Sequence, residues 1–572
     1  MKANVAALQF ATGTDLDENL ATCLRVIDLA GKSPVDLMVL PEFSNHISWY
    51  DDADHAWRVS LELNGEFLRA IAERAALYGC YIVINVSLRR PQRALTVSSL
   101  CYDPRGQLVG VADKQTLMGH ENIWFARAQE VSDVIPTPFG AMAMFPCRDG
   151  VTCETPRGLA LRGAQLFCDS LNSFALDEAS LHVPARAPEN KVFLVAANKI
   201  GPLIPAHLLQ AVSADTHIPL RFLSGAGESQ IVSPSGEILA RGPRSEEAVV
   251  RAQIDLQLAI DKSRPDGTDL FAARRPELYG PIIQSPVAPI CKKAVAAIGA
   301  ALLLPGAEGE AAITELPALV QQLPGNTALA VLPELFCYGD SRSLLVQPDP
   351  ALAERAIEMM VQACSDRPLM LCASLVLPVG AGFGVVSVLV DCHGVRAEQP
   401  QLHRCKRFGW MTPGEELSIV DLPWGSLAMI TGDDMVFPEL VKVAALRGAH
   451  VIAAPIQLQE PWEESLGLRS RAAENRVCIV ASSRPLDGRG GLIADLESEF
   501  TLMTEWEQRE FDGYINNPLV VEQGAEPGVV YRQIQPLAAC NKLMSERTDL
   551  LLDRPWSLSG SLVTPSRELS HD

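Results

Sequence analysis

The sequence is short of positive charge. It has 48 Lys and Arg residues against 69 Asp and Glu, which gives a formal net charge of −21 in 572 residues. Binding to nucleic-acid phosphates requires a clustered basic surface, which this sequence does not show. The charge balance therefore excludes nucleic acid as the expected partner and favours chemistry on small molecules.

Long apolar runs and paired cysteines are also lacking. The longest apolar run, residues 294–306, is well short of the roughly 20 residues that a membrane helix needs, and the first residues contain no signal-peptide core. The fourteen cysteines show no CxxC pairs or regular spacing, so we expect reduced core thiols and neither a zinc site nor a disulfide framework. We expect a soluble, cytoplasmic protein with no membrane association.

What the sequence does contain is an internal repeat. The stretch "PCRDGVTCETPRGLALRGA" (146–164) returns as "TGDDMVFPELVKVAALRGA" (431–449), at a constant offset of 285 (434 − 149 = 285). In the second stretch Gly432 replaces Cys147. Three further segments repeat in the same order: "VLPEF" (39–43) as "VLPEL" (331–335), "RAPENKVFLVAA" (186–197) as "RAAENRVCIVAS" (471–482), and "KSRPDGTDLFAARRP" (262–276) as "KLMSERTDLLLDRP" (542–555).

The repeats predict two collinear copies of one domain. We expect a catalytic domain over residues 1–280, a proline-containing linker over 281–293, a second domain over 294–560 and a C-terminal tail over 561–572. Short apolar runs alternate with segments of helical periodicity that end at glycine, which indicates an α/β layer structure. Turn sequences such as "DPRG" and "SPSG" predict antiparallel neighbours, so we expect a mixed sheet.

Three residue types in the first copy could carry chemistry. Cys147 follows an apolar strand and precedes a helix, where backbone amides and the helix dipole stabilise a thiolate. Glu42 ends another strand and could accept the thiol proton if burial raises its pKa. Lys114 also follows a strand. Taken singly, each residue is more often an ordinary core thiol or a solvated charge than a catalytic group.

Taken together, these residues lie in a recognisable set of motifs. The ordered series "VLPEF", "DKQTL", "ENIWFARA", "CRD" with "RGLALRGA", "RAPENKVFLVAANKIG" and "SQIVSPSGEILA" resembles the nitrilase superfamily of carbon–nitrogen hydrolases across nearly all of residues 1–280. The resemblance implies an α/β fold class with two tandem four-layer αββα sandwich domains.

The resemblance also implies the site residues. It gives a catalytic Glu42–Lys114–Cys147 triad with Glu121 in support. It further assigns oxyanion and substrate binding to Arg148, through its backbone N–H, together with Glu154 and Asn172. The expected chemistry passes through a thioester and needs no metal or organic cofactor. Two family positions differ here: Ala128 replaces a glycine and Cys153 replaces a proline.

The second copy is expected to be catalytically inactive. Glu334 is retained, but the alignment places Leu402 or His403 near the Lys114 position, Arg407 at the Glu121 position and Gly432 at the nucleophile. Members of the family pair through the helices that follow the nucleophile. We therefore expect the two halves to form an intramolecular pseudo-dimer, with further homo-oligomerisation left open. This half has no ATP-pyrophosphatase loop, which argues against a fused glutamine-dependent synthetase.

The expected function is hydrolysis of an amide or N-carbamoyl group of a small molecule, with release of ammonia or an amine. Nitrile hydrolysis is an alternative, disfavoured because Arg148 and Asp149 follow the cysteine where nitrile-cleaving members have Trp-Glu. A Cys–His site using His46 or His120 and a non-catalytic binding or scaffold protein are further alternatives. A carboxylate-bearing substrate would have Arg148 or Arg157 as its anchor.

Overall fold

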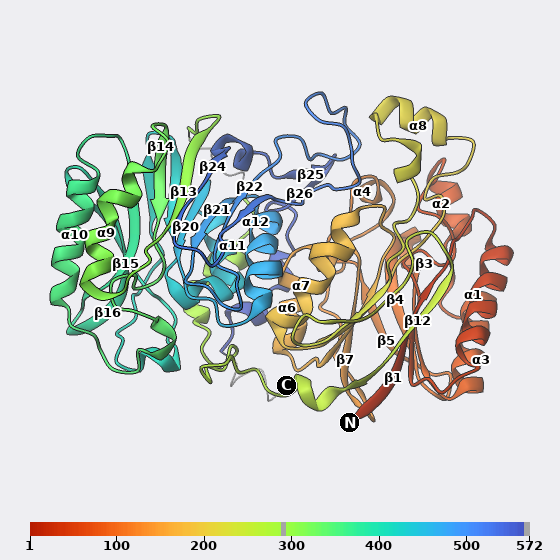
Figure 1. Ribbon diagram of the computed structural model, residues 1–572. Coiled ribbons are helices and arrows are strands. Elements are labelled where there is room, and N and C mark those ends of the chain that lie inside the picture. Colours follow the sequence, from red (N-terminus) through yellow and green to blue (C-terminus); the bar gives the residue numbers. More distant parts are fainter. Residues whose placement is uncertain (288–292, 566–572) are drawn as a thin grey trace.

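The computed structural model describes residues 1–287 and 293–565 (Figure 1). Parts of the predicted linker (288–292) and of the predicted tail (566–572) lie outside these ranges. The described chain forms four six-stranded sheets, two in each half, and one small two-stranded sheet. Each half is an αββα sandwich, so the chain contains two of them in tandem, as the sequence predicts.

The first half stacks two mixed sheets face to face. One has the order β12-β1-β2-β3-β4-β5 and the other β11-β10-β9-β8-β7-β6. Strand β1 pairs in parallel with β2 and antiparallel with β12, which gives the expected mixed sheet. The strands are β1 (Lys2–Gln9), β2 (Leu37–Val39), β3 (Tyr81–Arg89), β4 (Leu95–Tyr102), β5 (Leu108–Asp113), β6 (Ile135–Thr137), β7 (Gly140–Pro146), β8 (Leu166–Ser170), β9 (Phe193–Ala197), β10 (Gln230–Val232), β11 (Ile238–Arg241) and β12 (Ala248–Asp255).

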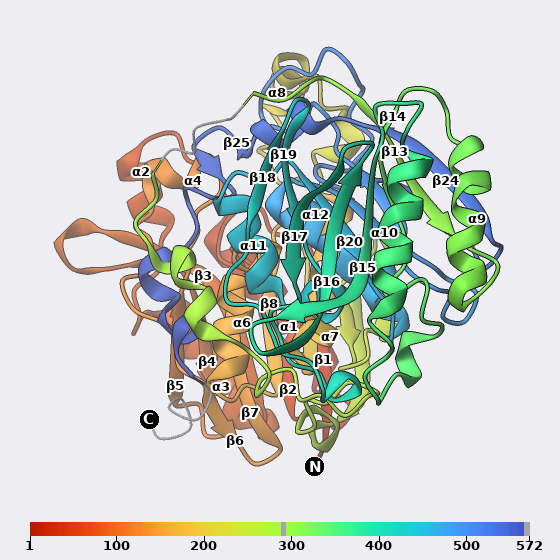
Figure 2. The ribbon, with the colours of Figure 1, turned by 90° about the vertical axis from the view of Figure 1, so that its left-hand side faces the viewer.

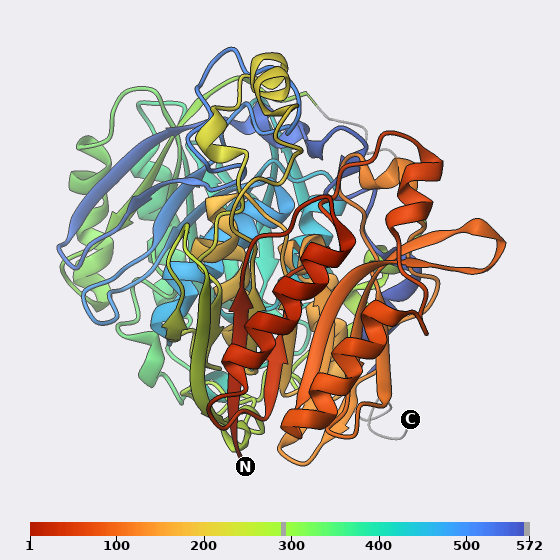
Figure 3. The ribbon, with the colours of Figure 1, turned by 90° about the vertical axis from the view of Figure 1, so that its right-hand side faces the viewer.

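Helices cover both outer faces of this sandwich. Helices α1 (Leu16–Ala30) and α3 (Glu66–Tyr78) lie on the outside of the first sheet, as Figure 3 shows in red and orange. Asp15 caps the start of α1 by accepting from two backbone N–H groups, and α3 ends at Gly79 with φ 61°, the left-handed conformation that glycine adopts without strain. Helices α6 (Glu154–Leu161) and α7 (Val183–Asn190) cover the second sheet. The shorter helices are α2 (Ala53–Val59), α4 (Glu121–Trp124), α5 (Arg148–Val151) and α8 (Leu209–Thr216).

The second half repeats this arrangement (Figure 2). Its sheets have the orders β17-β16-β15-β14-β13-β24 and β18-β19-β20-β21-β22-β23, and β25 pairs with β26. Its strands are β13 (Ile298–Leu304), β14 (Thr327–Val331), β15 (Met370–Val379), β16 (Gly382–Asp391), β17 (Gly394–Pro400), β18 (Ile419–Leu422), β19 (Gly425–Met429), β20 (Val451–Pro455), β21 (Cys478–Ser482), β22 (Leu492–Asp495), β23 (Leu519–Glu522), β24 (Gly528–Ile534), β25 (Leu543–Ser545) and β26 (Thr548–Asp549), and its helices are α9 (Gly309–Gln321), α10 (Ala351–Ala363), α11 (Pro438–Leu446) and α12 (Arg469–Asn475).

The two halves meet through the helices that follow the repeated segment. Helices α6 and α7 face α11 and α12 in the middle of the molecule (Figure 1). The contacts are related by the repeat: Glu154 pairs with Lys442 at 3.0 Å, and Arg157 pairs with Glu439 at 2.8 Å. Since the offset of 285 relates 154 to 439 and 157 to 442, each ion pair is the pseudo-symmetric copy of the other. This is the pattern of an isologous interface.

A second set of charges closes the centre of this interface. On α7, Arg186 pairs with Glu189 at 2.8 Å and with Glu474 of α12 at 3.0 Å. On α12, Arg471 pairs with both Glu189 and Glu474. All four side chains are buried. Two arginines and two glutamates alternate across the pseudo-twofold axis, so each buried charge has an opposite partner.

Two features bear on the composition-based expectations. Twelve cysteines in the described ranges are free and all but Cys147 and Cys392 are buried, while Cys540 takes part in a disulfide and departs from the expectation of reduced thiols. Among the described residues, no helix combines the length and apolar character needed to cross a membrane.

Candidate active site

Cys147 lies at a sharp turn between β7 and α5. Its backbone has φ 47° and ψ −104°, an unusual conformation for a residue other than glycine. The Asp169 carboxylate accepts from the Cys147 backbone N–H at 2.9 Å and holds the turn. Helix α5 contains only four residues, so the dipole effect expected from the sequence is small. What the turn does provide is a thiol that projects from a strand end into a cavity.

Lys114 lies between two carboxylates. Its Nζ donates to Glu42 Oε1 at 2.7 Å and to the Glu121 carboxylate at 2.9 Å. All three side chains are buried. Glu42 follows β2, Lys114 follows β5 and Glu121 begins α4, so the ends of separate elements bring the charges together. The second oxygen of Glu121 accepts from the backbone N–H of Met118 at 2.8 Å, which fixes the orientation of the carboxylate.

Burial and neighbouring charges shift the pKa values of Glu42, Cys147 and Lys114. Burial raises the pKa of Glu42 to about 7, with Lys114 opposing the shift and Glu121 adding to it. Burial and the Glu42 carboxylate raise the pKa of the Cys147 thiol well above its usual value, although Lys114 counteracts them. Burial alone would lower the pKa of Lys114, but the carboxylates of Glu121 and Glu42 outweigh it and the pKa rises. The resting site thus holds a protonated thiol, an ammonium and a carboxyl group that titrates near neutrality.

Asn172 also belongs to this site. It lines the same cavity as Cys147, and its backbone N–H forms a hydrogen bond with the Cys147 sulfur that lowers the thiol pKa. Arg148 and Glu154 are buried but do not line the cavity. Glu154 is instead engaged with Lys442 across the interface between the halves. The structure thus brings five of the seven sequence-predicted residues to one cavity and places the Arg148 and Glu154 side chains elsewhere.

Neither candidate histidine bonds to Cys147 in the described structure. His46 Nδ1 is hydrogen-bonded to the Ile47 carbonyl at 2.6 Å. His120 lines the cavity, but its Nε2 is hydrogen-bonded to the Ser48 carbonyl at 2.7 Å, and burial lowers its pKa. These contacts do not support the Cys–His alternative.

The cavity around Cys147 has a volume of about 270 Å³. Besides the residues above, its walls include Trp49, Met118, Phe174 and Ile204. Five further lining residues come from the second half of the chain: Leu502, Met503, Ser545, Glu546 and Arg547. The sequence analysis missed these five because they lie more than 350 residues from Cys147 (502 − 147 = 355). The repeat itself held the signal, since a pseudo-dimer places segments of one half against the other.

The corresponding position in the second half is a different site. Backbone hydrogen bonds fix the alignment: Lys114 N–H donates to Val97 O, and Gln401 N–H donates to Val385 O, both at 2.8 Å. Gln401 therefore occupies the Lys114 position, which corrects the sequence-based placement of Leu402 or His403 there. The sequence was ambiguous because this segment shares few residues with its counterpart. Counted without a gap from Gln401, the Glu121 position falls on Phe408 (401 + 7 = 408), one residue after the expected Arg407.

Arginines fill this second site. Arg407 binds Glu334 at 2.6 Å and Asp433 at 2.9 Å. Arg264, from the first half of the chain, pairs with Asp433 and also with Glu463 at 2.6 Å. Gly432 keeps a positive φ of 54°, but a Cβ atom there would clash with Glu334 Oε1 and approach Gln401 Oε1 to 2.7 Å. The local backbone has kept the turn, while the space for a nucleophile has closed.

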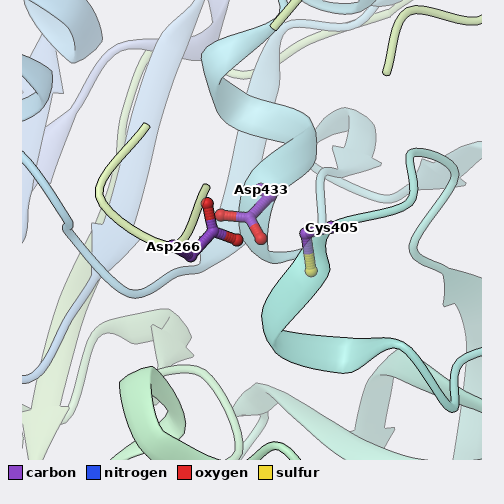
Figure 4. A group of neighbouring side chains, drawn as sticks. All are labelled: Asp266, Cys405 and Asp433. Carbon is purple, nitrogen blue, oxygen red and sulfur yellow. The ribbon is translucent and has the colours of Figure 1, made fainter. Parts of the chain in front are cut away.

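Three potential metal ligands lie beside this network. Asp266, Cys405 and Asp433 have ligand atoms within 4.8 Å of one another (Figure 4). However, Asp433 already accepts from Arg407 and Arg264, and the two guanidinium groups together lower its pKa despite burial. A divalent cation would meet these two positive charges at close range. The donor set is therefore better suited to the arginines than to a metal.

The first half of the chain is similar to known proteins. A model of the carbon–nitrogen hydrolase family matches residues 4–262. A nitrilase of Pyrococcus abyssi (strain GE5 / Orsay) is 28% identical over 264 residues, covering 46% of this chain and 93% of the relative. The N-carbamoylputrescine amidase of Solanum tuberosum is 26% identical over 293 residues, covering 48% and 93%. The NitFhit protein of C. elegans aligns structurally at 20% identity with a TM-score of 0.42, covering 48% of this chain and 66% of that one.

Residues 4–262 of the chain thus match the carbon–nitrogen hydrolase family model, and this first half is similar to proteins named as a nitrilase and as amidases. The second half repeats the fold.

Proposed function

We propose that the first half hydrolyses a non-peptide carbon–nitrogen bond, in an amide or an N-carbamoyl group, with Cys147 as the nucleophile. The observation that carries this proposal is the convergence of a thiol, an ammonium and two carboxylates in one cavity, with Lys114 within 2.9 Å of both carboxylates. Relatives named as amidases and a nitrilase support the reaction class.

The reaction follows from the residue types. Glu42 accepts the thiol proton as sulfur attacks the carbonyl carbon, so the unfavourable thiolate forms only as the new C–S bond does. The ammonium of Lys114 and the backbone N–H of Arg148 stabilise the oxyanion of the tetrahedral intermediate. Glu42 then returns the proton to the nitrogen, the C–N bond breaks and the amine leaves a thioester on Cys147.

Water completes the cycle. Glu42 takes one proton from water as the oxygen attacks the thioester, and the C–S bond breaks with return of that proton to sulfur. The net reaction is amide plus water to acid plus amine. Glu121 would orient Lys114 and stay in contact with the leaving group, as its bond to Met118 N–H allows.

Nitrile hydrolysis is the second candidate, because three relatives are named as nitrilases or a probable nitrilase. The Arg148-Asp149 pair after the nucleophile favours the amide reaction. We also propose the second half as a catalytically inactive partner that completes an intramolecular pseudo-dimer, within domain bounds of residues 1–280 and 294–560.

An ammonia-release screen tests the main proposal. The purified chain would be incubated with primary amides, N-carbamoyl amines and nitriles, with the Cys147→Ala variant as the blank. We expect ammonia and a carboxylic acid from a primary amide, or ammonia, carbon dioxide and the free amine from an N-carbamoyl amine, and none of these above background from the variant. Equal release by both proteins, or release from nitriles alone, would overturn the proposal.

A further inference from the structure

The walls of the Cys147 cavity divide by their origin in the chain. The reacting groups come from the first half, whereas Leu502, Met503 and the segment Ser545–Arg547 come from the second. Leu502 and Met503 lie on the connection between β22 and β23, which spans residues 496–518 and which we call the wall loop. Figure 1 shows β25 and β26, which adjoin this loop, beside α4 of the first half.

Buried contacts hold the wall loop on the first half. The Asp177 carboxylate accepts from the backbone N–H groups of Ile515 and Asn516, and the Gly513 carbonyl accepts from Leu176 N–H at 2.9 Å. At the other end of the loop, Leu502 N–H donates to Met544 O at 2.8 Å. The loop is therefore fixed at both ends of the stretch that reaches the cavity.

An aromatic cluster fixes its middle. The Phe511 ring packs edge-on against Phe174 at 5.9 Å and against Phe222 at 5.4 Å between ring centroids, both from the first half. Phe174 itself lines the cavity. The wall loop is thus a packed part of the cavity boundary and not a free connection.

Within the described residues, the first half has no counterpart of this loop at the equivalent connection. Between β10 and β11, the equivalent connection in the first half is the tight turn Ser233–Glu237, closed by Glu237 O accepting from Ser233 N–H at 2.9 Å. Arg264 enters the second site and pairs there with Asp433 and Glu463. The extra chain therefore serves only the site that contains a nucleophile.

The chemistry of the completed cavity is apolar. Leu203, Ile204 and Leu223, from residues 201–225 of the first half, face it together with Leu502 and Met503. Apart from the three proposed catalytic charges, the charged groups among the described lining residues are Glu546 and Arg547. These two lie 3.7 Å apart at the exposed mouth, where each can compensate the other.

We propose that the substrate is an amide bearing one uncharged apolar substituent of a few carbon atoms, and that Leu502 and Met503 of the second half select it. This inference rests on the proposed hydrolytic function. A cavity of 150 Å³ holds a benzene molecule, so about 270 Å³ accommodates an amide group with a substituent up to a single ring. A charged substituent would lose water without gaining a buried partner.

A substrate series tests the selectivity. The wild-type chain is assayed with acetamide, propionamide, butyramide and phenylacetamide, with 4-aminobutyramide and succinamate as charged matches. We expect kcat/KM to rise about fourfold per added methylene and to fall at least tenfold for the charged analogues. N-alkyl acetamides carry the substituent on the nitrogen instead of the acyl carbon. Comparing their kcat/KM with that of the acyl series shows on which side of the amide the cavity accepts the substituent. A preference for either charged analogue over butyramide would overturn the proposal.

Variants of the wall loop test the assignment of selectivity to it. Leu502→Ala and Met503→Ala should lower kcat/KM for phenylacetamide tenfold or more. The kcat/KM for acetamide should stay within about threefold of the wild-type value. Met503→Glu should raise kcat/KM for 4-aminobutyramide relative to kcat/KM for butyramide. Leu502 is buried, so its truncation can also lower the stability of the chain. Met503 is 38% exposed, so the Met503→Ala variant tests selectivity even in that case. Leu345→Ala, at an exposed leucine of the same half, is the matched control. Equal losses for acetamide and phenylacetamide would refute the assignment.

A binding assay separates this inference from the hydrolysis itself. Amides that occupy the cavity should slow alkylation of Cys147 by iodoacetamide, whether or not they are turned over. Preferential protection by butyramide and phenylacetamide, without turnover of any amide, would contradict the proposed hydrolysis. It would still support an apolar binding site at Cys147. Equal or better protection by 4-aminobutyramide would overturn the apolar site.

Discussion

At the scale of single residues, the two sites differ by an exchange of charges. The first site has Lys114 between Glu42 and Glu121. In the second, the lysine position holds Gln401, and Arg407, six residues further along the chain, binds the retained Glu334. In each arrangement every buried charge has an opposite partner, but only the first leaves a carboxylate and an ammonium next to a thiol. This pairing of charges explains why both copies can be stable while only one has the groups proposed for catalysis.

Glu42→Gln tests the proposed base. The amide cannot accept the thiol proton, so we expect kcat to fall by a factor of about a hundred or more. Cys147 should also be alkylated more slowly by iodoacetamide at pH 8. Asp54→Asn, an exposed carboxylate, is the control. Full activity in Glu42→Gln would assign the base elsewhere.

The pH dependence follows from the raised pKa of Glu42. A base with a pKa of about 7 is protonated at lower pH, so kcat/KM should fall about tenfold per unit below pH 7 and level off above it. The Glu121 carboxylate contributes to raising this pKa, so Glu121→Gln should move the acidic limb to lower pH, whatever its effect on the maximal rate. Profiles of kcat/KM from pH 5 to 9 measure the acidic limb of the wild type and of Glu121→Gln. An acidic limb at the same pH in both proteins would contradict the assignment of Glu42 as the titrating base.

At the scale of elements, the sequence predicted the layers of the sandwich better than the loops that line the Cys147 cavity. Repeated strand and helix patterns were sufficient for the sandwich, because apolar periodicity and glycine stops are local properties. The repeat offset changes only from 285 at Arg186 and Arg471 to 280 at Lys262 and Lys542. Yet the first copy has a long excursion between β9 and β10 and the second has one between β22 and β23. One long connection lies in each copy and their lengths are similar, so they change the repeat offset very little. The offset therefore gave no sign of either connection.

The site shows the same division. Glu42, Lys114, Glu121, Cys147 and Asn172 could be found because their motifs are contiguous in the chain. Arg264 and Met503 could not, because each acts on the opposite half and nothing local marks it. Glu154 was placed in the substrate site by its position in a motif, but its partner Lys442 became visible only when the halves were seen together.

The Glu154–Lys442 pair can be tested as a structural element. Glu154→Gln leaves a buried ammonium without its partner, and we expect the free energy of unfolding to fall by about 3–5 kcal/mol. The double variant Glu154→Gln with Lys442→Met should recover most of this loss. Urea unfolding measures the change, and labelling of Cys147 under native conditions should stay normal. Loss of labelling with unchanged stability would instead support the substrate-binding role expected from the sequence.

At the scale of the whole molecule, the interface used by pairing family members is already occupied. Helices α6 and α7 are covered by α11 and α12, and the charges at their centre are buried. We therefore expect the chain to be monomeric at micromolar concentration, with sedimentation equilibrium giving the mass of one chain. Arg157→Glu, which places like charges opposite Glu439, should loosen the halves and promote association between chains. A stable dimer of the unmodified chain would show that another surface pairs.

Each half also sends its last segment across to the other. Thr268 Oγ1 accepts from Lys406 N–H, and at the related position Thr548 Oγ1 accepts from Gly119 N–H, both at 2.8 Å. Two separate gene products with this exchange could pair in three ways, of which only one unites an active copy with its wall-bearing companion. Joining the copies in one polypeptide removes the other two. Within one polypeptide the two copies can differ without mispairing, so one can carry the proposed reaction while the other shapes the cavity.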